Sequence, residues 1–495
     1  MMDAYKRANE ALHPPASAVE RVVRRAAAGV RPRKKRRPLR AVIPAGVAAA
    51  LAVVLLVTGV PGLGGGGMSA SAAYALAEPT YPDLPHMPTE PLNGGDAAWE
   101  RFNEDYDAYW QAWKDFQDEV PRLYEQEDLL SALADFSAES TTLALAGEGN
   151  GVYSPISLWF ALAMLAETTD GDSRQEILDA LGAEDVEQLR SWADSLWHDL
   201  YTDDGTAAVL LGTSLWLNEG MDYRQETVDS LAEHYYAGSY RVPMGTDEAD
   251  DALSAWTAER TNGLIGADGK VLETTPDTLM VLASTLYAMG RWSDEFRAEN
   301  NTDDVFTAAD GTEQEAEFMH RTDDSTFLRR EGYQAAYLYT TAAQVVFVLP
   351  DEGVSPRDLL ADPDLLGSLD FEDEDAIYGE VQWSLPKFDV GSDLDLKSTL
   401  AGLGIASVLD PEAADFSPLT DTDPVWLNQA KQIARVKVDE QGIEAAAVTL
   451  LGASGAGGPP EDPQICVMDL DRPFLFVIRS NNDVNLFVGV VDSLV

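Results

Sequence analysis

The sequence predicts a large protein that combines helices and strands. Its 495 residues are enough for one large domain with extensions, and 45% of them are hydrophobic, which suffices for a sizeable core. Apolar residues recur every three or four positions in 97–120 and 131–145, the period of helices that bury one face. Runs typical of strands follow at 345–350, 433–438 and 474–478.

The composition excludes several classes of function. The formal net charge of −51 argues against nucleic-acid binding by the body of the protein, because phosphate contacts need clustered Lys and Arg. The single cysteine, Cys466, excludes an intrachain disulfide and a cysteine metal cluster. The five histidines are scattered, and neither a His-Glu-x-x-His pair nor a Gly-x-Ser-x-Gly motif occurs. A hydrolytic enzyme is therefore poorly supported, and we predict no metal site and no cofactor.

The N-terminal part differs from the rest of the chain. Residues 1–40 are rich in Lys and Arg, and the uncharged run 41–60 has about the length of a transmembrane helix. A basic cluster before such a run predicts a cytoplasmic N-terminus and a body outside the cytoplasm. We favour an uncleaved signal anchor over a cleaved signal peptide with its site near 70–72. Residues 61–95 are rich in Gly, Pro and Ser, which predicts a flexible stalk.

An acidic segment, 96–126, lies between this stalk and the main domain and is predicted to form an amphipathic helix. The apolar stripe of this helix contains Trp99, Phe102, Tyr106, Tyr109, Trp113, Phe116 and Val120. We expect the stripe to dock on the domain that follows it. Binding of a carbohydrate or of another partner is the alternative.

The stretch 438–449 changes character in its middle. A strand-like run leads into a glycine, then into an alanine-rich piece, and then into a loop at 452–460 that is rich in Gly and Pro. Read with a period of two, one face is small or apolar: Ile443, Ala445, Ala447, Thr449, Leu451 and Ala453. Such a segment suits a loop that can also enter a sheet as a buried strand. Composition alone also allows an alanine-rich helix ended by a glycine.

Residues 440–447 read Glu-Gln-Gly-Ile-Glu-Ala-Ala-Ala and resemble the reactive-loop hinge of the serpins, a family of protease inhibitors. Residues 150–165 predict a short strand, a turn and a helix with a Ser as its N-cap. Their first part, Asn-Gly-Val-Tyr-Ser-Pro-Ile-Ser at 150–157, is also similar to a second signature of that family. Further landmarks follow in the family's order at 213–216, 282–292, 385–388, 471–476 and 486–489. The resemblance covers about residues 127–495, and we expect a membrane-anchored or secreted bacterial member.

The resemblance implies an α+β fold for residues 127–495, with a large mixed β-sheet, two smaller sheets and about eight or nine helices. It also implies a mechanical inhibition. A protease attacks the exposed loop at 440–465 and forms an acyl-enzyme, and the cut loop then inserts into the large sheet and traps the protease. The partner would be an extracellular serine protease bound covalently to a monomeric inhibitor. A non-inhibitory serpin-fold binding or surface protein is the alternative, which an uncharged inward hinge face disfavours.

The resemblance assigns site residues by position. The hinge would consist of Glu440, Gly442, Ile443, Glu444, Ala445, Ala446, Ala447 and Thr449. The cleaved bond would join Ala456 to Gly457, in a stretch without Arg, Lys or aromatic residues, which favours elastase-like or subtilisin-like proteases. The shutter, where the large sheet parts, would contain Ser154, Ser157, Ser284 and Gln432, and Trp292 would lie in the breach at the top of that sheet.

Three of these positions depart from the family's pattern. Ile443 replaces the usual Thr or Ser at the first inserting position. Ser284 and Gln432 replace an Asn and a His that hydrogen-bond to each other across the shutter. Because Ser and Gln each carry a donor and an acceptor, a bond between Ser284 and Gln432 is chemically allowed.

Overall fold

The computed structural model describes residues 71–81, 84–89, 91, 95–203, 207–265, 271–427, 429–443 and 464–494. The predicted basic segment and membrane anchor, 1–60, and most of the predicted reactive loop, 444–463, lie outside these residues. Within the described residues, none of the helices combines the length and the apolar character needed to cross a membrane.

Helices and two extensive sheets make up the described part of the chain, which confirms the α+β class. Its ten α-helices are α4 (Asp96–Gln117), α5 (Glu127–Ala144), α6 (Pro155–Thr168), α7 (Gly171–Leu181), α8 (Val186–Leu200), α9 (Gln225–His234), α10 (Asp247–Arg260), α11 (Pro356–Leu360), α12 (Leu365–Ser368) and α13 (Lys397–Gly402). Nine of these helices, α5 to α13, lie within residues 127–495, in agreement with the eight or nine expected there.

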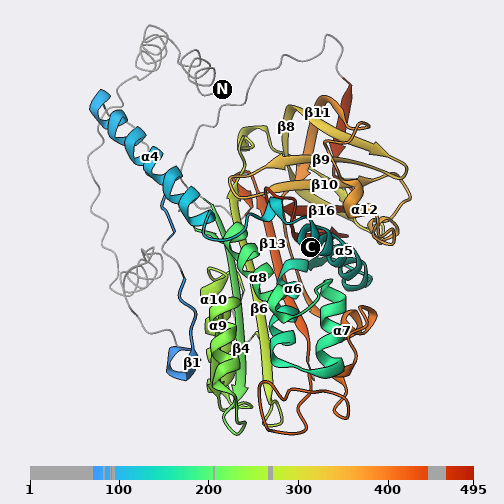
Figure 1. The fold of residues 1–495 in the computed structure, drawn as a ribbon. Coiled ribbons are helices and arrows are strands. Elements are labelled where there is room, and N and C mark those ends of the chain that lie inside the picture. Colours follow the sequence, from blue (N-terminus) through green and yellow to red (C-terminus); the bar gives the residue numbers. More distant parts are fainter. Residues whose placement is uncertain are drawn as a thin grey trace, which may run out of the picture. The chain divides into compact units, whose positions relative to one another are not determined.

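The first sheet is the large mixed sheet that the sequence predicted. Its strand order is β1 (Ala75–Ala77), β5 (Ala237–Val242), β4 (Ala208–Asn218), β6 (Met280–Arg291), β14 (Gly442–Ile443), β13 (Lys431–Asp439) and β12 (Phe388–Asp395), with β3 (Thr202–Asp203) attached to β4. Figure 1 shows the long strands β4 and β6 side by side, and they are paired antiparallel. Successive residues of β4 enter two different cores: Leu215 and Leu217 join the main core, whereas Trp216 packs with Trp256 of α10.

The second sheet has nine strands. Its order is β15 (Ile465–Asp469), β11 (Ile377–Pro386), β8 (Glu313–Arg330), β9 (Tyr333–Tyr339), β10 (Gln344–Pro350), β16 (Phe474–Arg479), β17 (Asn485–Val491) and β2 (Gly151–Tyr153), with β7 (Thr302–Thr307) attached to β8. The sequence led us to expect two smaller sheets here. In the structure, backbone hydrogen bonds join the two expected sheets into one. The connection is β8, whose 18 residues pair with β7 and β11 along most of the strand and with β9 at its end.

Helix α6 lies in the main core and contacts β6 of the first sheet and β17 of the second. Every residue from Pro155 to Thr168 except Ala161 is buried, as expected for a helix that is hydrophobic all round. Ser154 caps its N-terminus, because its Oγ accepts a hydrogen bond of 3.2 Å from the backbone N–H of Ser157. This confirms the predicted strand, turn and Ser-capped helix at 150–165.

The segment before the serpin-like region is partly docked. Strand β1 pairs with β5 at the edge of the first sheet, inside the predicted stalk. Tyr81 stacks on Trp197 of α8 at 5.7 Å, and the guanidinium of Arg260 lies 5.0 Å from the Tyr81 ring. The stalk prediction did not anticipate this docking, because a three-residue edge strand carries almost no sequence signal.

The C-terminal half of α4 confirms the expected docking of the aromatic stripe. Tyr109, Trp113 and Phe116 are buried, and Phe116 stacks on the His198 ring of α8 at 4.8 Å. Trp99 and Trp110 of the same helix are 42% and 54% exposed. Helix α4 therefore covers α8 with one end of its stripe and presents large aromatic side chains to solvent elsewhere.

Candidate functional site

Strand β13 ends in a tight turn, from which the predicted hinge begins. Gln441 N–H donates a hydrogen bond of 2.9 Å to Asp439 Oδ1, which closes this turn. Gly442 follows with φ of +150°, and a Cβ at that position would collide with the carbonyl oxygen of Gly290. Because only glycine fits both the backbone angle and the close approach, the turn needs a glycine where the sequence has one.

The first residues of the predicted hinge form β14, a strand of the large sheet. Ile443 lies opposite Val438 of β13 on one side and opposite Gly290 of β6 on the other, and both pairings are antiparallel. Its side chain is only 3% exposed. Within the described residues β14 is the only link between β6 and β13, since no ladder joins these two strands directly.

Trp292 holds the turn at residues 439–441. Its indole Nε1–H donates a hydrogen bond of 2.8 Å to the carbonyl oxygen of Asp439, and its backbone N–H donates one of 2.9 Å to Gln441 O. Trp292 is 2% exposed, so both bonds are shielded from water. The backbone N–H of Phe296 adds a third bond to this turn, of 3.2 Å, to Glu440 O.

The side chain of Glu440 is anchored by two residues that the sequence did not single out. Lys387 Nζ lies 2.6 Å from Glu440 Oε1, and Asn301 Nδ2 donates to the same oxygen at 2.7 Å. Partial burial acts to raise the pKa of Glu440, but the bonds from Lys387 and Asn301 outweigh it and hold that pKa below its usual value. Lys387 also pairs with Glu317 at 2.7 Å, so the predicted hinge glutamate belongs to a charged cluster.

Gln432 connects β13 to the capped end of α6. Its Oε1 accepts a hydrogen bond of 2.7 Å from Ser154 N–H, and its Nε2 donates one of 2.9 Å to Ser154 O. Gln432, Ser154 and Ser157 are all buried. The Ser157 hydroxyl has no hydrogen-bond partner in the part of the chain that the structure describes. The structure thus brings together three of the four residues assigned to the shutter.

Ser284 is not a hydrogen-bond partner of Gln432, so the bond that we considered between them is absent. The side-chain amide of Gln432 uses both its C=O and its NH₂ on the backbone of Ser154, at the start of α6. Ser284 lies half-buried on β6, opposite Thr213 of β4. Ile443 lies opposite Val438 of β13 and Gly290 of β6. Gln432 and Ser284 each lie six residues before these two positions, so they are at the same level of the sheet.

The remaining predicted site residues lie outside the described part of the chain. These are the hinge residues Glu444, Ala445, Ala446, Ala447 and Thr449, and the two residues of the predicted cleaved bond, Ala456 and Gly457. The description resumes at Gln464, and β15 then pairs parallel with β11. The roles assigned to these residues stay predictions.

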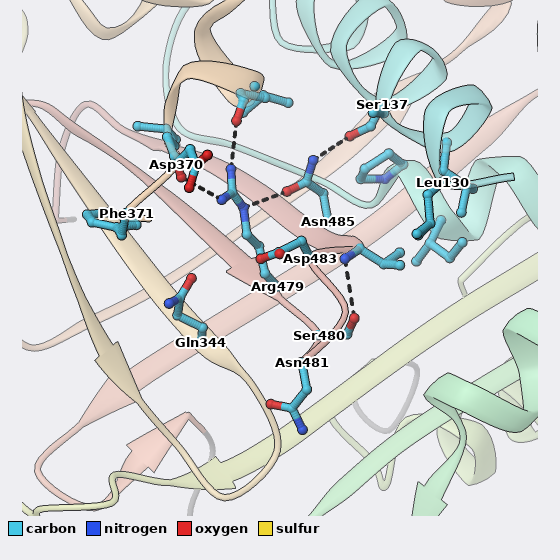
Figure 2. A pocket seen from close by; sticks show the side chains of 18 of the residues that line it. Leu130, Ser137, Gln344, Asp370, Phe371, Arg479, Ser480, Asn481, Asp483 and Asn485 are labelled. Atoms are coloured by element: carbon cyan, nitrogen blue, oxygen red, sulfur yellow. Dashed lines mark hydrogen bonds between the residues drawn. The ribbon is translucent and has the colours of Figure 1, made fainter. Parts of the chain in front are cut away.

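A cavity of about 570 Å³ lies away from the hinge, between α5, α12 and the ends of β16 and β17. Figure 2 shows Arg479 at its centre. The Arg479 guanidinium is buried and donates to Leu366 O at 2.7 Å, Leu369 O at 2.9 Å and Asn485 Oδ1 at 3.0 Å. Burial lowers the pKa of Arg479. No group of three or more His, Cys, Asp or Glu side chains able to hold a metal occurs among the described residues.

Comparisons with known proteins agree with this geometry. A family model described as serpin (serine protease inhibitor) matches residues 132–493. The chain is 28% identical over 380 residues to a putative serpin, serpin-Z6C of Oryza sativa subsp. japonica, which covers 70% of this chain and 91% of that protein. It is 26% identical over 376 residues to alpha-1-antitrypsin of Sus scrofa, covering 72% and 85% of the two chains. Because these relatives come from a plant and a mammal, the bacterial source stays a prediction.

Solved structures show the same fold. The thermophilic serpin tengpin in its native state superposes with a TM-score of 0.66 at 24% identity, over 76% of this chain and 100% of that chain. At this identity the likeness establishes the fold alone. The family model, however, covers most of the chain, and the relatives named above span most of their own length. The chain therefore belongs to the serpin family.

Proposed function

We propose that this protein inhibits serine proteases by loop insertion. The observation that carries the proposal is β14: Gly442 and Ile443 of the predicted hinge already pair with β6 and β13 as the beginning of a central strand. A protease that cuts the loop beyond the hinge frees the following residues to extend β14 between the same two neighbours. The acyl-enzyme would be carried along and distorted before water could release it.

The chemistry of the next residues suits such an extension. Ile443 is buried, so its face contains Ala445, Ala447 and Thr449, all small enough for a sheet that covers a packed core. Each backbone hydrogen bond gained on insertion contributes about 1 kcal/mol, so a strand that gains bonds on both edges stabilises the cleaved form substantially.

The sequence of the predicted loop tip supports a target with a shallow specificity pocket. Residues 452–458 contain only Gly, Ala and Ser, with no cation for a trypsin-type pocket and no ring for a chymotrypsin-type pocket. We propose cleavage between Ala456 and Gly457 by elastase-like or subtilisin-like proteases. The inhibitor would act once and would not turn over, in keeping with a protein that is not an enzyme.

A non-inhibitory binding protein is the second candidate. The cavity around Arg479 favours it, because a concave site of about 570 Å³ with a buried cation has the size of a small-molecule site. The hinge sequence favours inhibition, because its inward face from Ile443 to Thr449 carries no charge that would oppose burial in the sheet.

A gel experiment distinguishes the two candidates. The protein is mixed with elastase, subtilisin, trypsin and chymotrypsin, and complexes that resist denaturant are looked for. We expect a covalent complex with elastase or subtilisin and a released fragment whose new N-terminus, read by mass spectrometry, lies within residues 453–459. Cleavage by these two proteases with no covalent complex would identify a substrate and favour the binding protein.

Replacing a small residue beyond β14 tests the role of the hinge. Ala447→Arg should turn the inhibitor into a substrate, because Ala447 shares the face of the buried Ile443 and an unpaired guanidinium there costs several kcal/mol when the strand extends into the sheet. Since about 1.4 kcal/mol corresponds to a factor of ten, the complexed fraction of cleaved inhibitor should fall at least about tenfold. Ala446→Arg is the matched control: it adds the same charge on the opposite face of the strand and should leave the complex yield much less changed. Equal yields from the two variants would refute the hinge assignment.

We also propose that the serpin domain lies outside the cytoplasm, tethered through the apolar run 41–60. The support is the basic cluster that precedes this run in the sequence. Protease added to intact cells should remove the domain. A domain that survives on sealed cells and is degraded only after lysis would contradict this topology.

A further inference from the structure

A second cavity, of about 290 Å³, lies where α4 crosses the body of the protein. One wall comes from α4, and the opposite wall comes from the end of α8, the start of β4 and the turn between β16 and β17. Neither the proposed inhibition nor the family match, which begins at residue 132, accounts for a site whose first wall is α4. The cavity is therefore a separate candidate site.

The α4 wall is aromatic. Tyr109, Trp110 and Trp113 line the cavity, and the ring centroids of Tyr109 lie 5.4 Å from Trp110 and 6.4 Å from Trp113. Trp110 is 54% exposed, so its ring is accessible to a ligand from solvent. Trp113 is 8% exposed, and its indole Nε1–H is buried with no hydrogen-bond partner in the described part of the chain. Because that nitrogen is shielded from solvent, a ligand in the cavity would meet this wall through its aromatic rings and not through the indole N–H.

The opposite wall is polar. Asp199 accepts a hydrogen bond of 2.7 Å from Asn482 and forms no ion pair within the described residues. Burial raises its pKa to about 6 in spite of that hydrogen bond and of the positive charge on Arg122. Asn481, also on this wall, is exposed. The partly desolvated carboxylate of Asp199 can accept hydrogen bonds from hydroxyl groups, and the amide of Asn481 can donate hydrogen bonds to them.

We propose that this cavity binds a neutral saccharide. The C–H face of a sugar ring would pack on the aromatic side chains of Trp110 and Tyr109, while its hydroxyls would donate to Asp199 and accept from the side-chain amide of Asn481. The other ligand classes fit less well. Asp199 and the strong net negative charge repel an anion, and the many polar lining groups disfavour a purely apolar ligand. A cation is the alternative that the choline comparison tests.

Titration of the full-length protein tests the proposal. Glucose, galactose, mannose and N-acetylglucosamine, and their β-linked disaccharides, are added and binding is followed by calorimetry and by ligand-observed NMR. We expect at least one of them to saturate a single site with a Kd on the order of 0.1–10 mM. Choline chloride and sulfated heparin disaccharide are the cationic and anionic comparison ligands, and neither should bind at the cavity. Binding of choline alone, or no saturable binding of any sugar, would overturn the proposal.

Variants locate the binding in the cavity. Trp110→Ala removes an exposed ring and should weaken the saccharide about tenfold or more, and Asp199→Asn should weaken it similarly by removing the charged acceptor. Trp99→Ala is the matched control, because Trp99 is an exposed tryptophan of the same helix that does not line the cavity. Trp110→Ala decides the question even if Asp199→Asn fails to fold. Unchanged affinity in Trp110→Ala, or an equal loss in Trp99→Ala, would refute the site.

Discussion

The hydrogen bond from the Trp292 indole to Asp439 O fixes the point at which the chain leaves β13, and the account of this protein depends on that point. With the turn held there, Gly442 and Ile443 continue between β6 and β13. The ion pair of Glu440 with Lys387 secures the same turn from its exposed side. The start of the hinge is therefore fixed before any protease arrives, and only the residues beyond Ile443 need to move.

A second contact lies farther along the large sheet, beyond the start of the hinge. Gln432 ties β13 to the N-terminus of α6 through two hydrogen bonds to Ser154, at the level where Ser284 lies on β6. An inserting strand would have to pass this level, so the two contacts mark the beginning and the middle of the path that we propose. Ile443 adds to the starting point, because burying its side chain contributes roughly 1.5–3 kcal/mol that the usual Thr or Ser would not supply in full.

Local pattern was enough to predict much of this arrangement. The alternation of 433–438 predicted β13, the Ser-Pro pair at 154–155 predicted the capped start of α6, and the order of short motifs predicted the fold. The assignment of Trp292 to the breach stays a prediction. The stripe on α4 was also readable, because helical periodicity shows which side chains share a face.

The missed features are contacts between segments far apart in the chain. Lys387 and Asn301 converge on Glu440 from two other parts of the sequence, and no local pattern marks either as its partner. The bond that we considered between Gln432 and Ser284 failed because the backbone of Ser154 offers Gln432 both a donor and an acceptor at closer reach. The joining of two sheets through β8 likewise follows from strand length and register, which periodicity alone does not give.

The central claim is that β14 is the start of a strand that lengthens once the loop is cut, and thermal unfolding tests it most directly. A protease that forms no complex is used to nick the loop within 452–460, and the melting temperatures of intact and nicked protein are compared. Because the extended strand would add hydrogen bonds on both edges of the large sheet, the account predicts that the nicked protein melts well above the intact protein. Equal melting temperatures, or a lower one for the nicked protein, would contradict it.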